Sequence, residues 1–176
     1  MWPLAIVVGF PIGGLVANAI VGQVDSVGSA LAGGLIAGAI AGAAQWLALR
    51  RLVSWAWVAA TSVGMAAGLT AGASLVDYGI SRGDLGLMGA VTGVCTGGLQ
   101  ALVLAPRTSP GKALLWAAGG PPAWALAWLV TSYVITGNVE ERFTNFGASG
   151  ALVFALLTGL LLTMFFRRME LGARTT

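Results

Sequence analysis

The chain has 176 residues, of which 57% are hydrophobic and only 9% charged, and its formal net charge is +3 at pH 7. Soluble domains carry about 25% charged residues, so this composition excludes a polar surface facing water and predicts one all-α integral membrane domain over residues 1–176. The nine basic residues are dispersed and lie beside apolar segments, which favours a membrane surface over nucleic acid as their partner.

Side chains that carry enzyme chemistry are scarce. The chain has no histidine, and Cys95 is its only cysteine, so neither a histidine base nor a multi-cysteine metal site can form within one chain. No charged residue falls in the middle of an apolar segment, where proton relays and ion-coupled transporters place ionisable groups. The sequence therefore predicts a protein that is not an enzyme, with no catalytic or metal-binding residue and no identified cofactor.

Six apolar segments account for almost the whole chain, at roughly 2–22, 27–49, 54–76, 85–105, 113–136 and 146–166. About 20 residues of α-helix span the hydrocarbon core of a bilayer, so each segment predicts one transmembrane helix. Ala17-Asn18-Ala19 has the small residues of a signal-peptidase site, but Met1-Trp2-Pro3 lacks the basic residues of a signal peptide. We expect the first segment to remain uncleaved.

Basic residues separate by side of the membrane. Seven follow the even-numbered segments, and only Arg82 and Arg142 follow the odd-numbered ones; the seven are Arg50, Arg51, Arg107, Lys112, Arg167, Arg168 and Arg174. Cytoplasmic loops of membrane proteins are enriched in lysine and arginine. The asymmetry predicts that both termini lie in the cytoplasm, and we expect the membrane to be a bacterial cytoplasmic (inner) membrane.

An internal repeat is visible in the spacing of small residues and tryptophans. The even-numbered segments share a row of small residues: Gly34, Gly38, Gly42; Gly89, Gly93, Gly97; and Ala151, Ala155, Gly159. The odd-numbered segments carry a tryptophan that precedes the last small residue of the row by 40, 40 and 43 positions (Trp2 to Gly42, Trp57 to Gly97, Trp116 to Gly159). This predicts three related helical hairpins, at about 1–52, 53–108 and 109–169.

The small-residue rows predict how the helices associate. Lipid provides no hydrophobic drive for helix association, so transmembrane helices gain contact energy where small side chains allow close approach. We therefore expect the three even-numbered helices to meet each other around a pseudo-threefold axis normal to the membrane. The three tryptophans near the helix ends are typical of the aromatic belt at a membrane interface.

Gln45 and Gln100 are the candidate intramembrane polar positions, because they occupy matching places in the first two repeats, whereas the third repeat has Leu162. Each amide predicts either hydrogen bonds between helices or a polar site for a solute, a lipid headgroup or a pigment. Pro121-Pro122, within the fifth segment, must interrupt helix hydrogen bonding. That interruption predicts a kink, a late helix start or a binding site at a broken helix.

One segment carries a family resemblance. Residues 42–51, Gly-Ala-Ala-Gln-Trp-Leu-Ala-Leu-Arg-Arg, with Trp55 and Trp57 shortly after, resemble a motif of small bacterial multi-pass membrane proteins of unknown function. The resemblance covers the first repeat well, the second loosely and the third poorly. It implies a helical membrane architecture and no particular activity.

Two classes of function fit these observations. The first is a structural or accessory subunit, which would dock to a larger membrane complex, to a second copy of itself, to membrane lipids or to a carotenoid-like pigment. It is favoured by short links, seven tryptophans and no charge at mid-depth. The alternative is a small channel or facilitator for a neutral solute, favoured by the repeat and the paired glutamines.

Overall fold

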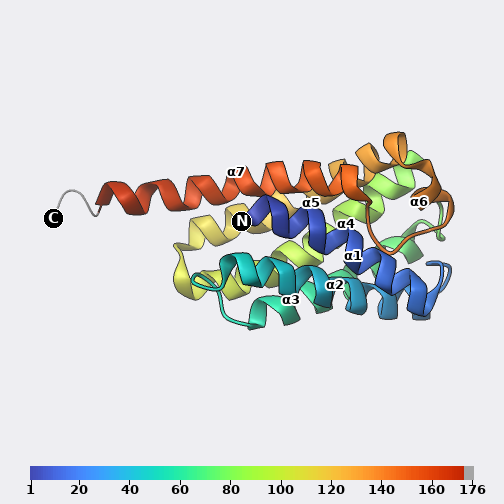
Figure 1. Ribbon diagram of the computed structural model, residues 1–176, viewed down its shortest axis with the longest axis horizontal. Coiled ribbons are helices and arrows are strands. Elements are labelled where there is room, and N and C mark those ends of the chain that lie inside the picture. The colour runs from blue at the N-terminus through green and yellow to red at the C-terminus, as the bar shows by residue number, and fades with distance from the viewer. Residues whose placement is uncertain (173–176) are drawn as a thin grey trace.

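The computed structural model describes the backbone of residues 1–172 and the side chains of these residues except 137–138 and 165–172. In that part of the chain all regular structure is helical, which confirms the all-α prediction. The elements are α1 (Trp2–Val21), α2 (Val27–Leu49), α3 (Ala56–Leu75), α4 (Arg82–Leu104), the 3-10 helix η1 (Ala105–Arg107), α5 (Pro110–Val134), the short α6 (Thr136–Glu140) and α7 (Ala148–Gly172). The six long helices lie side by side in one bundle (Figure 1).

The outer surface of the bundle is apolar. Five helices are long and apolar enough to cross a membrane, namely α1, α2, α3, α5 and α4 together with η1, and α7 adds a shorter apolar stretch over Ala148–Met164. Large aliphatic side chains point outward along the bundle, with Leu114 69% and Leu156 70% exposed. Lipid covers such a surface, and each helix satisfies its own backbone hydrogen bonds. The protein is a multi-pass helical membrane protein.

Local sequence signals account for the helix ends. α2 and α4 begin with reciprocal capping boxes, in which Ser26 pairs with Ser29 and Ser81 with Asp84. α3 ends in a tight turn that directs the chain into α4. There the amide of Tyr78 donates to the carbonyl of Ala73 at 2.8 Å, and Tyr78 has a left-handed φ of 57°. These signals keep the links between helices short.

The helices form a closed ring in the order α1, α2, α3, α4, α5, α7 and back to α1. Within the described residues, the backbones of α2, α4 and α7 do not approach one another, and α2 and α4 are joined through the side chains of Gln45 and Gln100. The prediction that these three helices meet at a central axis was therefore wrong. The physical reason is that short links hold consecutive helices antiparallel and adjacent, so each small-residue row serves the neighbour in the ring.

Rows of glycine bring four of the neighbouring helix pairs into backbone contact. The row of α2 faces α3 and the row of α4 faces α5: an added Cβ at Gly38 would lie 2.7 Å from the Cα of Ser62, and one at Gly93 would lie 2.5 Å from the carbonyl oxygen of Gly120. Glycines of α1 and α3 face α2 and α4 in the same way, at Gly9, Gly13, Gly64 and Gly68. In α7, Ala151 and Ala155 are buried, whereas an added Cβ at Gly159 would meet nothing closer than Trp2, at 3.6 Å.

The double proline lies inside a continuous helix. α5 runs from Pro110 through Pro121 and Pro122 to Val134, so the late helix start considered from the sequence does not occur. Proline has no amide hydrogen and leaves a carbonyl one turn earlier without its helical donor. Gly119 and Gly120 precede the two prolines, and Gly120 is where Gly93 of α4 makes its backbone contact. The interruption thus coincides with the closest approach of α4 and α5.

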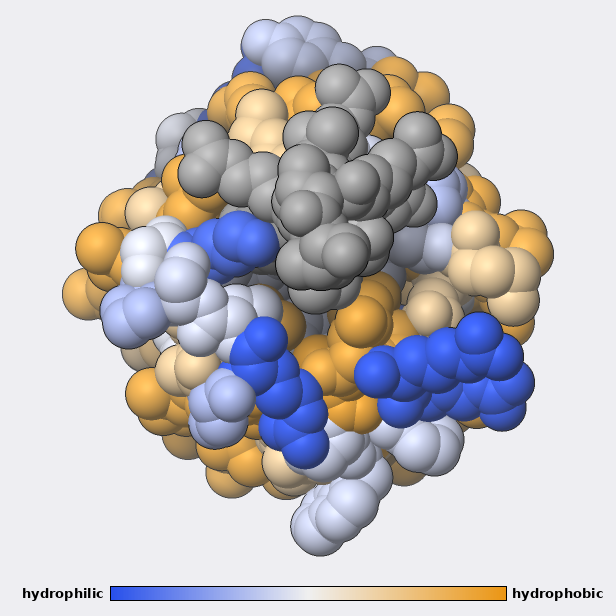
Figure 2. All heavy atoms as spheres, turned by 90° about the vertical axis from the view of Figure 1, so that its left-hand side faces the viewer, coloured by the Kyte–Doolittle hydropathy of each residue, from blue (hydrophilic) through white to orange (hydrophobic). Residues whose placement is uncertain are grey.

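Charged residues lie at the two ends of the bundle. The basic end carries the N-terminus, the α2–α3 link with Arg50 and Arg51, and the α4–α5 connection with Arg107 and Lys112 (Figure 1). Figure 2 looks onto this end and shows hydrophilic residues around an apolar area. Arg167, Arg168 and Arg174 were also predicted to lie on the cytoplasmic side. The side chains of the first two, and the whole of Arg174, lie outside the described residues. The links α1–α2, α3–α4 and α5–α7 form the opposite end.

Candidate functional site: the filled interior of the ring

An amide–indole network, formed by Gln45, Gln100, Trp57, Trp116 and Thr61, crosses the interior of the ring near its basic end. Gln45 accepts from the Trp57 indole N–H at 2.9 Å, and Gln100 accepts from that of Trp116 at 3.0 Å. The amide nitrogen of Gln100 donates to the Gln45 carbonyl at 3.2 Å and to the Thr61 hydroxyl at 2.8 Å. Because an indole N–H is only a donor, both glutamines must present their oxygen to it. The network thus connects α2, α3, α4 and α5.

This arrangement places the two candidate glutamines together, although the backbones of their helices do not approach each other. Gln45 is 1% and Gln100 4% exposed, so both amides are removed from lipid and water. Thr61 completes the pairing by donating to the carbonyl of Trp57, on its own helix, at 2.8 Å. Of the two interpretations made from the sequence, hydrogen bonding between helices is the one that the geometry displays.

The structure does not place Trp2, Trp57 and Trp116 in an aromatic belt at the membrane interface, where the sequence predicts them. Trp57 is fully buried, Trp116 is 3% exposed and Trp2 is 7% exposed. Their rings meet inside the bundle, with centroids 5.6 Å apart for Trp57–Trp116 and 6.0 Å for Trp2–Trp116. Trp2 donates to the Thr158 hydroxyl of α7 at 3.0 Å. Belt tryptophans keep the indole N–H in water, whereas here polar side chains of neighbouring helices accept it and make burial favourable.

An aromatic cluster fills the interior farther from the basic end. Its members are contributed by α1, α5, α7 and the segment before α7: Phe10, Trp124, Trp128, Phe146 and Phe154. The rings of Phe10 and Phe146 stack at 4.9 Å, and Trp124 meets Phe146 edge-on at 5.0 Å. Such pairs each contribute about 0.5–1.5 kcal/mol beyond the burial of their area. This cluster was not predicted, because its members do not recur at matching positions of the three predicted repeats.

The segment before α7 turns into the bundle at the opposite end. Thr144, Asn145 and Phe146 are each at most 2% exposed, although the sequence placed them in a link or at a helix start. The Asn145 side-chain amide donates to the carbonyl of Phe10 at 3.0 Å, and the Asn18 side-chain oxygen accepts from the Thr144 amide at 3.0 Å. These bonds fasten the inserted segment to α1. A threonine–asparagine–phenylalanine run beside charged residues reads as a solvated link, so the insertion was not predicted.

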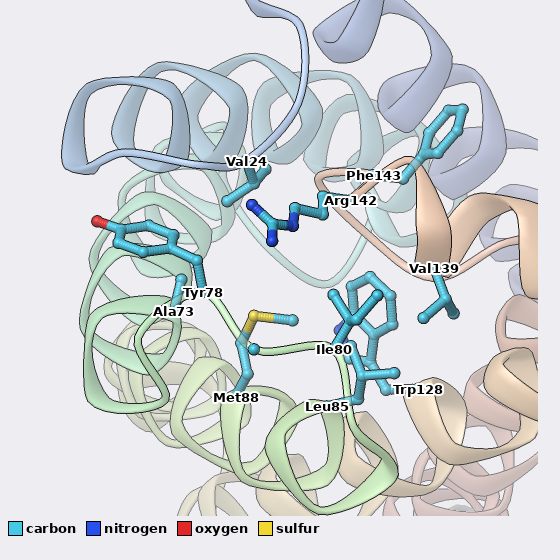
Figure 3. Close-up of a pocket in the computed structure, with 11 residues that line it drawn as sticks. Val24, Ala73, Tyr78, Ile80, Leu85, Met88, Trp128, Val139, Arg142 and Phe143 are labelled. Atoms are coloured by element: carbon cyan, nitrogen blue, oxygen red, sulfur yellow. The ribbon is translucent and has the colours of Figure 1, made fainter.

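A small cavity of about 20 Å³ lies beside the inserted segment, and it has room for about one water molecule. Figure 3 shows the Arg142 side chain reaching into the middle of its lining residues, among them Met88 and Trp128. Arg142 is half-buried and has a left-handed φ of 49°, while its carbonyl accepts from the amide of Val24 at 3.0 Å. The cavity is too small for an organic solute.

A larger groove of about 740 Å³ opens at the basic end between α1, the end of α2 and α7. Its lining is mostly apolar, and it includes Trp2, Gly159 and Leu162. Leu162 occupies the position that the predicted repeat aligns with Gln45 and Gln100. The groove therefore lies where the predicted third repeat departs from the pattern of the first two.

These features describe a ring whose interior is occupied by paired polar groups and aromatic rings, with an apolar groove on the side of α1 and α7. The geometry supplies helix-to-helix hydrogen bonds, aromatic packing and an apolar recess. No family model, curated protein or solved structure matches the chain.

Proposed function

We propose that the protein is a non-enzymatic accessory subunit of a bacterial inner membrane, whose rigid bundle docks to a larger membrane complex, to lipid or to a pigment. The observation that carries this proposal is the filled interior. The amide–indole network and Trp2 occupy one half of the ring, and the aromatic cluster with the inserted segment occupies the other. A bundle packed in this way holds a fixed shape and offers a solute no polar path along its axis.

The orientation and the repeat belong to the same proposal. The basic residues at one end support cytoplasmic termini under the positive-inside rule. The threefold repeat of hairpins is supported by Trp2, Trp57 and Trp116. Each donates its indole N–H to a side chain of the second helix of a predicted hairpin, which is α7, α2 and α4 respectively.

A flux measurement tests the docking role against the channel alternative. Purified protein in liposomes should give no glycerol or urea permeability above that of empty liposomes, because the axis holds no open path. Gln45→Leu and Gln100→Leu should lower thermal stability or partner association in detergent and leave that baseline unchanged. Flux through the wild type that disappears in the folded double variant would reject the accessory role.

The channel for a neutral solute is kept as a second candidate by one observation. The hydroxyls of Thr70, Thr96 and Thr131 are buried and have no hydrogen-bond partner among the described residues. Hydroxyls without partners can accept bonds from a polar solute passing between helices, although the tryptophan layer would have to move to admit it. Glutamine-dependent flux in the liposome assay would favour this candidate.

A further inference from the structure

The groove between α1 and α7 has the size and shape of a ligand site. Its volume of about 740 Å³ falls within the range of about 300–1,000 Å³ usual for small-molecule sites. The end of α2 closes it on one side, and its walls are formed largely by Trp2, Leu49, Leu52, Leu156, Leu160 and Leu162. It opens toward the outer surface, where Leu156 is 70% and Leu160 57% exposed.

We call the contact line between two neighbouring helices of the ring a seam. The groove exists because the seam between α7 and α1 lacks the backbone contact that the other seams have. At the α4–α5 seam a Cβ on Gly93 would lie 2.5 Å from the Gly120 carbonyl oxygen, so no space remains. At the α7–α1 seam the corresponding Gly159 faces only the Trp2 ring, 3.6 Å from an added Cβ. Leucines line the rest of the seam, so the space left open is apolar.

The described side chains of the lining that can donate a hydrogen bond, those of Trp2 and Thr163, already do so. The Trp2 indole N–H is already donated to Thr158, and the Thr163 hydroxyl donates to the carbonyl of Leu160 at 2.8 Å. An occupant must therefore be apolar where it contacts the walls. Hydrocarbon chains have this property, and the groove opens onto the surface that lipid covers.

Positive charge lies at the end of the groove. Arg50 and Arg51 are both exposed, and they stand between Leu49 and Leu52, which line it. Among the residues whose side chains are described, all five acidic residues lie at the opposite end of the bundle: Asp25, Asp77, Asp84, Glu140 and Glu141. No described carboxylate is therefore placed to neutralise the two arginines, whose guanidinium groups bind phosphate oxygens in bidentate fashion.

We propose that this groove binds one anionic phospholipid, with its acyl chains along α1 and α7 and its phosphate at Arg50 and Arg51. The inference deepens the proposed docking role and rests on it for its biological purpose. Binding itself is measured separately from solute flux, so the failure of one proposal does not imply the failure of the other.

Native mass spectrometry of the purified full chain tests the proposal. Phosphatidylglycerol and phosphatidylcholine with identical acyl chains are added in equal amounts, and the lipid retained per protein is counted. Each basic residue near an anionic lipid surface contributes on the order of 1 kcal/mol, so two arginines should favour one phosphatidylglycerol by roughly tenfold or more. Equal retention of the two lipids by the wild type would overturn the proposal.

Variants with a matched control locate the binding. Gly159→Leu fills the groove, whereas Gly98→Leu adds the same side chain on α4, where nothing lies within 4 Å of an added Cβ. We expect Gly159→Leu to lose the bound lipid and Gly98→Leu to keep it. The pair Arg50→Gln and Arg51→Gln should retain both lipids equally, because the groove remains while the charge is gone.

Two further results would contradict a lipid as the occupant. One is retention of phosphatidylglycerol by folded Gly159→Leu at the wild-type level. The other is a wild-type dimer that Gly159→Leu dissociates, since a second copy of the chain would then fill the groove. If Gly159→Leu fails to fold, Leu156→Trp blocks the groove from an exposed position and should abolish retention in its place.

Discussion

Trp57 and Trp116 each donate to a glutamine inside the ring, whereas Trp2 donates to a threonine at the edge of an open groove. The two glutamine sites lie among α2, α3, α4 and α5, where glycines hold neighbouring backbones in contact. The threonine site lies between α1 and α7, where leucines replace the polar group and the contact is looser. One change of residue type in a repeated pattern thus separates a closed seam from an open one.

The comparison indicates a division of labour within one ring. A glutamine can serve two helices at once because its amide offers both an acceptor and two donors, and Gln100 uses both capacities. A leucine at position 162 offers neither, so among the described residues the first and last helices are joined by packing and by the bond from Trp2 to Thr158. The closed seams give the bundle rigidity, and the open seam gives it a surface for a ligand.

The largest expected effect is the difference in stability between two glycine-to-leucine variants, one at a closed seam and one at the open seam. Gly93→Leu places its side chain where the α5 backbone lies 2.5 Å from an added Cβ, so α4 and α5 must separate. We expect a loss of more than about 4 kcal/mol, seen as absence of folded protein in detergent extracts. Gly159→Leu should yield folded protein, because the groove accepts the side chain. Equal yields from the two variants would contradict the comparison.

The second effect removes a glutamine from the closed side. Gln100→Leu deletes three hydrogen bonds, among them the one that Gln100 accepts from the buried Trp116 N–H. The expected loss is about 2–3 kcal/mol, measured by unfolding in detergent. Gln45→Leu, which deletes two bonds, should cost less. A larger loss of stability for Gln45→Leu than for Gln100→Leu would show that the number of hydrogen bonds lost does not determine the loss of stability in this network.

The sequence predicted the helices well because their signal is composition. All six apolar segments correspond to helices, and most of the predicted ends lie within a few residues of the observed ones. It also singled out Gln45 and Gln100, since an amide inside an apolar segment must find a partner. Both positions could be recognised without knowing which helices meet.

What the sequence did not predict depends on the order of helices around the ring. Small-residue rows indicate close approach and do not name the neighbour, so α2 and α4 were expected to meet although they share only the contact of their glutamines. The burial of Trp57 was missed for the same reason, since its acceptor belongs to another helix. Asn145 carries no periodic signal, and its insertion follows from a bond to the α1 backbone.

A third effect compares indole groups across the ring. Trp116→Phe leaves the Gln100 carbonyl without its donor in a closed interior, and we expect a loss of about 2 kcal/mol. Trp2→Phe should cost about 1 kcal/mol, because Thr158 keeps its bond to the Phe154 carbonyl and the groove can adjust. Thermal unfolding in detergent measures both. A larger loss of stability for Trp2→Phe than for Trp116→Phe would show that the α1–α7 seam contributes more to stability than the closed interior does, against the comparison.

The smallest effect isolates the hydrogen bond from Trp2 to Thr158, which joins α1 to α7. Thr158→Val removes the acceptor of the Trp2 N–H while nearly preserving side-chain shape, so the change in stability reports the bond rather than a cavity. Interhelical hydrogen bonds in membranes contribute about 0.6–2 kcal/mol, and we expect about 0.5–1 kcal/mol because the seam is already loose. Thr163→Val is the matched control on the same helix, since its exposed hydroxyl donates only to the carbonyl of Leu160. If Thr158→Val costs as much as Gln100→Leu, the α1–α7 seam is as tightly fastened as the others, and its groove cannot be attributed to the missing glutamine.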